Sequence, residues 1–396
     1  MINSANQHRL RFLLILGTLS ATGPLSIDLY LPALPQMVRQ FHTTTAMMQL
    51  SITACLLGLA VGQLISGPLS DHFGRRKPLF IGFIVFGLAS LAIAVSHSVS
   101  LLIGLRFVQG LAGAAGQVLS RAVARDLFSG KALTQFYALL NSVNGLFPIL
   151  APIIGGFMIK FVPWSGIFIL LGVIGFLLSG LILIGIPETL RPENRLTGPV
   201  FQSFLSFGTL LKQQGFFSQL LITGVVYGSL FSYIAASTFI YQQLFHLSAQ
   251  SFSLIYALNG LGIVIGSGLP ARLTGISTYR QLSSGIGLCM ADAMALLLGA
   301  YLHWGLVMIA VLIFLLVIGV GMLLTLTTAI IMGETTQNAG GASALIGLSQ
   351  NAFGGLSSPL VGLFGTNSLA PMAGLVLIYN LIAGGLAYRV HHQLHK

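Results

Sequence analysis

The apolar residues of this chain fall into long, almost unbroken stretches that are separated by short polar segments. A helix that crosses about 30 Å of hydrocarbon needs about 20 mostly apolar residues. On that measure the pattern predicts twelve membrane-spanning helices. Their approximate ranges are 10–31, 47–69, 78–96, 101–124, 134–159, 164–186, 217–240, 250–271, 279–301, 304–331, 341–364 and 370–389.

The longest polar stretch, residues 187–215, lies near the middle of the chain and divides these spans six and six. Two fused parallel repeats of six helices each produce such an arrangement. We therefore predict an N-terminal six-helix bundle at 9–187, a central cytoplasmic linker at 188–216 and a C-terminal six-helix bundle at 217–390.

The composition of the 396-residue chain excludes several other classes of protein. Hydrophobic residues make up 55% and charged residues 6% of it, against about 25% charged residues in soluble domains, so a charged water-facing surface could not form. Disordered chains are poor in aromatic residues, whereas this one carries 26 Phe and 10 Tyr. The net charge of +11 is spread singly or in pairs between apolar stretches, so we expect no nucleic-acid partner.

The lysines and arginines fall mostly on one side of the predicted spans. With the N-terminus in the cytoplasm, 15 of the 18 lie in cytoplasmic segments, Arg39 and Lys160 lie on the opposite side, and Arg106 lies within a span. Cytoplasmic loops of membrane proteins carry such an excess. We predict a multi-pass protein of the cytoplasmic (inner) membrane with both termini in the cytoplasm.

The loop after the second span reads G-P-L-S-D-H-F-G-R-R-K-P at residues 67–78. Glycines permit a close approach of helix ends or a turn with positive φ, and Asp71 can neutralise the positive N-terminus of the next helix. An ordinary positive-inside loop would explain the three basic residues but not the acid or the two glycines.

This loop resembles the motif G-x-L-a-D-r-x-G-r-k of the major facilitator superfamily, with His72 where the family usually carries a fixed positive charge. The resemblance implies two six-helix bundles, and in that family the fourth helix ends beside this loop. We predict a cytoplasmic cluster that closes the inner side when the transporter faces outward. Its members are Gly67, Asp71, Gly74, Arg75 and, just past the fourth span, Asp126.

An arginine, Arg106, lies inside the fourth span. Its insertion costs about 2.5–3.5 kcal/mol, so it needs a partner and indicates a functional site. The alternative is a residue that snorkels from near the helix end. The run L-I-G-L-R-F-V-Q-G at 102–110 resembles the superfamily's fourth-helix motif l-x-x-x-R-x-x-q-G, in which the arginine is linked to proton transfer.

The first span ends in S-I-D-L-Y-L-P-A-L-P at 26–35. Burial favours the protonated form of Asp28, and a nearby Arg106 would favour the charged form; a proton carrier needs this competition. The alternative is an acid at the membrane edge that caps the external loop. The run resembles the first-helix signature of twelve-span drug:proton antiporters, in the form found in the bicyclomycin-resistance (Bcr/CflA) subfamily. The resemblance leads us to expect that Asp28 is the principal proton-coupling residue.

The fifth span carries G-L-F-P-I-L-A-P-I-I-G-G at 145–156. Prolines remove backbone hydrogen bonds, and glycines let a neighbouring helix approach, so a generic packing face is the alternative here. The run resembles the antiporter motif g-x-x-x-G-P-x-x-G-G, which separates exporters from symporters, although Ala151 replaces one glycine and one proline is extra. The motif positions are Gly145, Pro148, Pro152, Gly155 and Gly156.

Further polar and aromatic side chains within the spans are candidates for a substrate cavity, with helix–helix hydrogen bonding or packing as the alternative. Asp292 in the ninth span is either a second protonation site or a residue near the external surface, and we favour the surface. The cavity candidates are Tyr30, Gln109, Tyr137, Asn141, Asn144, Tyr227, Phe231 and Tyr233.

These features predict an all-α polytopic protein that exports small, mostly lipophilic drugs in exchange for protons. We expect alternating access, no cofactor beyond the proton gradient, no metal, the lipid bilayer as surroundings, and a functional monomer. An exporter of an amino acid or other metabolite, or a proton symporter, remains an alternative on the same scaffold. An intramembrane enzyme is a weaker alternative, because none of the nine histidines pairs with an acid at ligand spacing.

Overall fold

A computed structural model shows the chain as helices that divide into two compact units. The first unit comprises Met1–Ala33 and Ala54–Ser203, and the second comprises Leu34–Thr53 and Phe204–Lys396. Every regular element among the described residues is a helix, because backbone polar groups in hydrocarbon must be satisfied within their own segment. The structure describes residues 2–128, 130–195, 208, 210–273, 275–334, 339–365 and 368–394.

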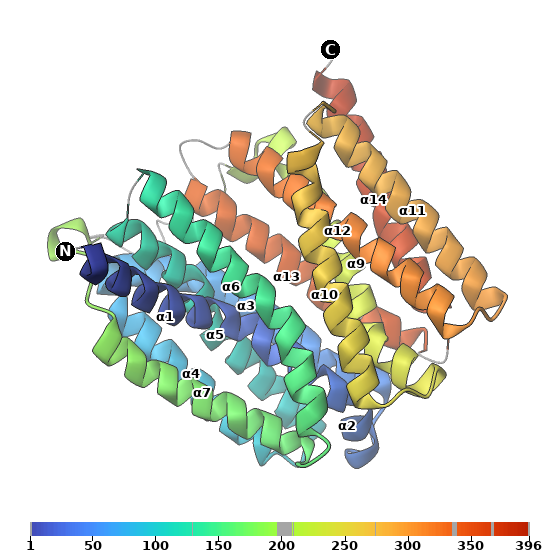
Figure 1. Ribbon diagram of the computed structural model, residues 1–396, viewed down its shortest axis with the longest axis horizontal. Helices are drawn as coiled ribbons and strands as arrows, with labels where there is room; N and C mark the ends of the chain where they lie inside the picture. The colour runs from blue at the N-terminus through green and yellow to red at the C-terminus, as the bar shows by residue number, and fades with distance from the viewer. Residues whose placement is uncertain are drawn as a thin grey trace. The chain divides into compact units, whose positions relative to one another are not determined.

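In the first unit, α5 packs against α1 and α4, α1 also packs against α6, and α4 lies beside α7 (Figure 1). The interior of this unit is built from fully buried apolar side chains such as Leu16, Phe83 and Leu119. The elements are α1 (Ile2–Asp28), η1 (Leu31–Ala33), the later part of α3 (Thr45–Phe73), α4 (Arg76–Ala94), α5 (Val99–Leu127), α6 (Gly130–Met158), α7 (Trp164–Gly185) and η2 (Pro192–Asn194).

In the second unit, α9 packs against α13, α14 and α12, and α11 lies beside α14 (Figure 1). Its helices α10 and α12 also pack against each other. The elements are α2 (Leu34–Gln40), α9 (Gln214–Phe239), the π-helical turn η3 (Ile240–Leu244), α10 (Ala249–Arg272), α11 (Thr278–Tyr301), α12 (Leu306–Glu334), α13 (Ala339–Leu363) and α14 (Ala370–Leu394).

The outward faces of these helices are apolar, as a bilayer requires. Leu177 and Ile184 on α7 expose 63% and 81% of their surface, and Val307 on α12 exposes 77%. In water such a continuous apolar surface would promote aggregation, whereas lipid solvates it. The all-α polytopic architecture predicted from the sequence is therefore confirmed.

Among the described residues, ten helices are long and apolar enough to cross a membrane. The two other predicted spans, 134–159 and 341–364, correspond to α6 and α13; α6 contains a shorter apolar segment, Val143–Met158. The count of twelve spans and the cytoplasmic termini stay predictions.

The segment Leu34–Thr53 belongs to the second unit, although the predicted N-terminal bundle at 9–187 includes it. Side-chain hydrogen bonds explain this: Gln49 Nε2 donates to the carbonyl of Ala235 at 2.8 Å, and Thr53 Oγ1 donates to the carbonyl of Gly355 at 2.7 Å. The start of α3 is thus bound to helices that follow it by about two hundred residues or more.

Three histidines end helical segments in the left-handed conformation. His42, His246 and His303 have φ of 48°, 53° and 52°, values that few residues other than glycine adopt. His42 follows Phe41 after α2, and His246 follows Phe245 after η3. The same dipeptide with the same backbone conformation after the first and the seventh predicted spans supports the internal repeat.

Candidate functional site

Arg106 is the eighth residue of the 29-residue helix α5 and is completely buried. Its Nη1 donates to the carbonyl of Ser26 on α1 at 3.1 Å and also to Oε1 of Gln109, one turn along α5. The guanidinium carbon lies 4.5 Å from the centre of the Tyr30 ring, a cation–π distance. Gln109 in turn donates from Nε2 to Ser90 Oγ at 2.6 Å, so this amide is fixed between α4 and α5.

Two nitrogens of this guanidinium, Nε and Nη2, have no hydrogen-bond partner within the described part of the chain. Asp28, the last residue of α1, comes two positions after Ser26 and is 6% exposed. A snorkelling arginine would reach a polar surface, which a fully buried side chain does not do. Among the described residues of the first unit, a buried guanidinium with two unbonded nitrogens therefore contacts the carbonyl that lies two positions before a buried acid, Asp28.

The fifth-span motif brings α6 against the end of α1. An added Cβ at Gly155 would overlap the carbonyl oxygen of Leu29, the residue after Asp28. Only glycine allows this approach. The predicted motif residues Gly145, Pro148, Pro152 and Gly156 all lie in the same uninterrupted helix, α6.

The cluster predicted at the cytoplasmic side is assembled around Arg75. Its Nη1 lies 2.5 Å from Asp71 Oδ1, and its Nε lies 3.0 Å from Asp126 Oδ2. Nη1 also donates to Ser70 Oγ at 2.6 Å. The Arg75 side chain is 4% exposed, against 37% for Asp71 and 14% for Asp126, so the cation is buried between one exposed and one mostly buried carboxylate.

Glu188, which we had placed only in the linker, completes this cluster. Its Oε1 accepts from the backbone N–H of Arg75 at 2.8 Å, and its Oε2 accepts from the N–H of Arg76 at 3.2 Å. Gly74 makes this possible: its φ is +86°, and a Cβ there would overlap the Glu188 carboxylate. The signal in the sequence was an acid directly after a span, in a chain with seven acids.

Thr189 and Arg76 add further bonds to the same region. Thr189 Oγ1 donates to Asp126 Oδ2 at 2.9 Å, and the Arg76 side chain donates to the carbonyl of Leu183 on α7. Gly67 has no comparable role: an added Cβ would meet only Val118, at 3.9 Å. The expected need for a glycine at 67 is therefore not supported by packing.

The predicted cavity residues separate into different surroundings. In the first unit, Tyr30 and Gln109 surround Arg106, whereas Tyr137 donates from its hydroxyl to the carbonyl of Arg121 at 3.0 Å. Asn144 Nδ2 donates to Ser20 Oγ at 3.0 Å. The side chain of Asn141 lies outside the described residues.

In the second unit, the predicted aromatic residues form two groups. The rings of Tyr227 and Phe231 are 5.0 Å apart, and those of Tyr233 and Tyr256 stack at 5.9 Å. Asn259 Nδ2 donates to the Tyr233 hydroxyl at 2.7 Å. Tyr256 and Asn259, two further polar side chains within the spans, thus belong to the same group as Tyr233.

Asp292 lies well inside α11, nine residues before the helix ends at Tyr301, or about 14 Å at the helical rise. The favoured position near the external surface stays a prediction, and this place within the helix argues against it. One of its oxygens, Oδ2, is buried without a hydrogen-bond partner in the described part of the chain. In the described ranges no three His, Cys, Asp or Glu side chains come together as metal ligands.

Comparison with known proteins places this geometry in a family. The family model described as Major Facilitator Superfamily matches residues 15–359. An MFS-type transporter of Bacillus subtilis, YdgK, is 38% identical over 98% of this chain and 96% of its own. A bicyclomycin resistance protein homolog of Haemophilus influenzae is 31% identical over 91% of each chain.

The fold comparison agrees. A bacterial homolog of the human lysosomal transporter Spinster, in an inward-facing and occupied conformation, has a TM-score of 0.77 with 14% identity, over 97% of each chain. At that identity the likeness concerns the fold alone. The family match, the two sequence relatives and the apolar helices agree that this chain belongs to the Major Facilitator Superfamily, as a multi-pass membrane transporter and not an enzyme.

Proposed function

We propose that this transporter is a proton-coupled antiporter that exports small, mostly lipophilic drugs across the cytoplasmic membrane by alternating access. The observation that carries the proposal is the fully buried Arg106, which contacts the carbonyl two residues before Asp28. Its Nε and Nη2 have no hydrogen-bond partner among the described residues. The relation to a bicyclomycin resistance protein homolog supports a drug as the cargo.

In this mechanism Asp28 carries the proton and Arg106 sets when it is released. A buried cation stabilises the carboxylate form of a nearby acid, and burial stabilises the neutral acid. When Asp28 is deprotonated, its carboxylate supplies the anion that the open guanidinium nitrogens lack. When a proton binds, Arg106 loses that interaction and the first unit favours a different arrangement of α1 and α5.

Exchange of drug for proton follows if the drug binds more tightly to the protein when Asp28 is deprotonated. By linkage, a drug that binds more tightly to deprotonated Asp28 loses affinity by the same factor when the proton binds. Binding of a proton from outside then releases the drug, and release of that proton to the cytoplasm prepares the site for the next drug molecule.

The ion pairs of the Arg75 cluster have the strength that a change between inward-facing and outward-facing states requires. Ion pairs that are partly exposed contribute about 0–1 kcal/mol each, so a few of them bias an equilibrium without locking it. Both arrangements must be populated for turnover, which limits their difference to a few kcal/mol.

Two measurements test the proposal. The protein is expressed in a host that lacks its own pumps, and susceptibility to a panel of drugs is compared with that of the empty host. Drugs to which it gives resistance are then added to inverted membrane vesicles with an established pH gradient, and we expect them to discharge the gradient.

Each alternative has its own outcome. Resistance without proton movement would exclude proton coupling. Proton movement on addition of amino acids, with no change in drug susceptibility, would identify a metabolite exporter on the same scaffold. Transport of solute into the cytoplasm with the proton would identify a symporter.

A further inference from the structure

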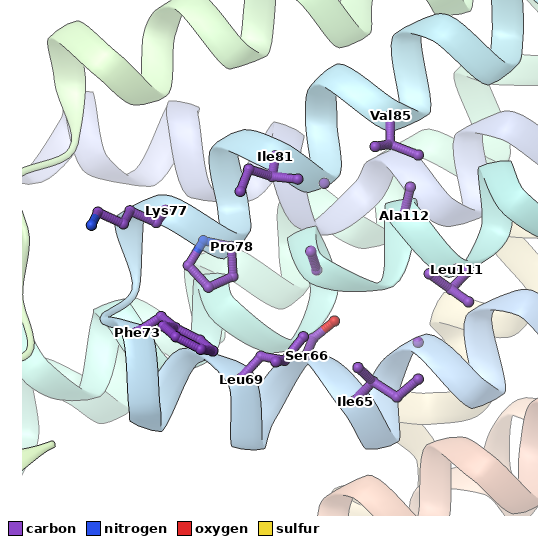
Figure 2. A pocket seen from close by; sticks show the side chains of 13 residues that line it. Ile65, Ser66, Leu69, Phe73, Lys77, Pro78, Ile81, Val85, Leu111 and Ala112 are labelled. Atoms are coloured by element: carbon purple, nitrogen blue, oxygen red, sulfur yellow. The ribbon is translucent and has the colours of Figure 1, made fainter. Parts of the chain in front are cut away.

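A groove of about 440 Å³ lies between α3, α4 and α5 in the first unit, apart from Arg106 and Asp28. Figure 2 shows Ile65, Leu69 and Phe73 along α3 and Pro78, Ile81 and Val85 along α4, with Lys77 at one end. Its floor is formed by α5 through Leu111, Ala112 and Ala115.

The wall of the groove is apolar except at two residues, Ser66 and Lys77. Lys77 is the second residue of α4, and Val85 lies eight residues further along the same helix, or about 12 Å at the helical rise. The groove therefore runs from a charged end beside the loop after α3 to an apolar end inside the span. An occupant must combine a long apolar part with an anionic end.

The charge of Lys77 is free for such an occupant, in contrast to its two basic neighbours. Arg75 is paired with Asp71 and Asp126, and the Arg76 side chain is bound to the carbonyl of Leu183. Lys77 is exposed, and its amino group has no hydrogen-bond or ion-pair partner within the described ranges of the chain. In Figure 2 this amino group points outward from the end of the groove.

We propose that this groove binds an anionic phospholipid, with one acyl chain between α3 and α4 and its phosphate at Lys77. Lysine side chains at the ends of membrane helices extend to the headgroup level, and basic sites between membrane helices on the cytoplasmic side bind anionic headgroups. The apolar floor of Leu111, Ala112 and Ala115 offers an acyl chain no polar group that would be left unpaired.

The site adjoins the Arg75 cluster. Lys77 follows Arg75 and Arg76, whose backbone N–H groups are held by Glu188. A lipid phosphate at Lys77 would stabilise the first turn of α4 in the same position that Glu188 fixes. The bound lipid thus becomes a structural partner of the loop and is distinct from the exported molecule.

The test is lipid retention by the full-length protein in detergent, measured by native mass spectrometry with added phosphatidylglycerol or phosphatidylcholine. We expect the wild type to retain phosphatidylglycerol in preference, and Lys77→Gln to lower that preference about fivefold, the effect of one basic side chain near a membrane surface. Lys160→Gln, which removes an amine beside the Phe161 ring, is the matched control and should leave the preference unchanged.

The apolar half of the groove is tested separately. Val85→Trp fills its inner end and should weaken retention of both lipids, whereas Leu177→Trp on the exposed face of α7 should not. If Val85→Trp fails to fold, Ile81→Trp at the exposed lip (59% exposed) replaces it. Equal losses in Lys77→Gln and Lys160→Gln, undiminished retention in the tryptophan variants, or displacement of the lipid by an exported drug would each overturn the proposal.

Discussion

The backbone N–H of Arg75 donates a 2.8 Å hydrogen bond to Oε1 of Glu188, a residue 113 positions further along the chain. The side chain of the same arginine is bound to Asp71 on α3 and Asp126 on α5. One residue therefore connects the ends of α3, α5 and α7 with the start of α4. This arrangement makes the loop after α3 a junction at which several helices can be held or released together.

Removal of the Glu188 carboxylate should loosen the start of α4. Glu188→Ala leaves three backbone N–H groups, those of Arg75, Arg76 and Leu190, without their acceptor. Because the site is open to solvent, we expect the free energy of unfolding to fall by about 0.5–1.5 kcal/mol. Thermal unfolding in detergent measures it. Glu193→Ala, an exposed acid in η2, is the control, and an equal shift in both variants would contradict a specific role for Glu188.

The two carboxylates that bind Arg75 should contribute unequally to the stability of the protein. Asp126 is the more buried and also accepts from Thr189, so Asp126→Asn should destabilise the protein more than Asp71→Asn, whose exposed pair contributes about 0–1 kcal/mol. Unfolding midpoints of the two variants decide the order. Equal midpoints would show that burial does not set the strength of these pairs.

Asp71→Asn should also shift the population toward the inward-facing state and slow turnover. We expect drug affinity in that state to change little, because the cluster lies apart from Arg106. Single cysteines introduced at the expected cytoplasmic helix ends, in a chain with Cys55→Ala and Cys289→Ala, report accessibility to a thiol reagent. Unchanged labelling would indicate that the loop serves only as a topology signal.

Asp28→Asn should abolish proton-driven export while the protein still inserts and binds drug. Asparagine keeps the shape of the side chain but cannot exchange a proton. Drug-induced discharge of a pH gradient in inverted vesicles is the readout, with Asp292→Asn as the comparison. If the Asp28 variant still exports against a gradient, the proton is carried elsewhere, and a loss of coupling in the Asp292 variant would identify that residue.

Arg106→Ala should leave drug binding but impair cycling. Without the cation, the carboxylate of Asp28 loses a charge that stabilises it, so the pH profile of exchange should change and turnover at neutral pH should fall several-fold. Arg106→Lys keeps a charge but not the contacts with Ser26 and Gln109, and should be intermediate. Normal transport and an unchanged pH profile in Arg106→Ala would contradict the role that we assign to this residue.

Gly155→Ala should weaken the packing of α6 on α1, since the added methyl group meets the carbonyl of Leu29. Overpacking of this kind costs about 1–3 kcal/mol. Gly180→Ala on α7, where nothing lies within 4 Å of the added atom, is the matched control and should be neutral or slightly stabilising. The difference between their unfolding midpoints measures the close approach.

The sequence alone was sufficient for the class of fold and for the location of the charged sites. Apolar stretches of about 20 residues can only be membrane helices when each backbone group must be satisfied locally, so the elements followed from local pattern. Asp71, Arg75 and Asp126 were recognisable because the loop at 67–78 resembles the superfamily's motif and because in that family the fourth helix ends beside this loop.

The tertiary structure decided what these residues touch. Glu188 reaches Arg75 across 113 positions, and Gln49 and Thr53 bind carbonyls 186 and 302 positions away. No local periodicity encodes such contacts, because they depend on which helix ends meet. The left-handed Gly74 and the close approach at Gly155 are likewise consequences of helix packing. Packing also distinguishes a glycine that the fold requires from one, such as Gly67, that it does not.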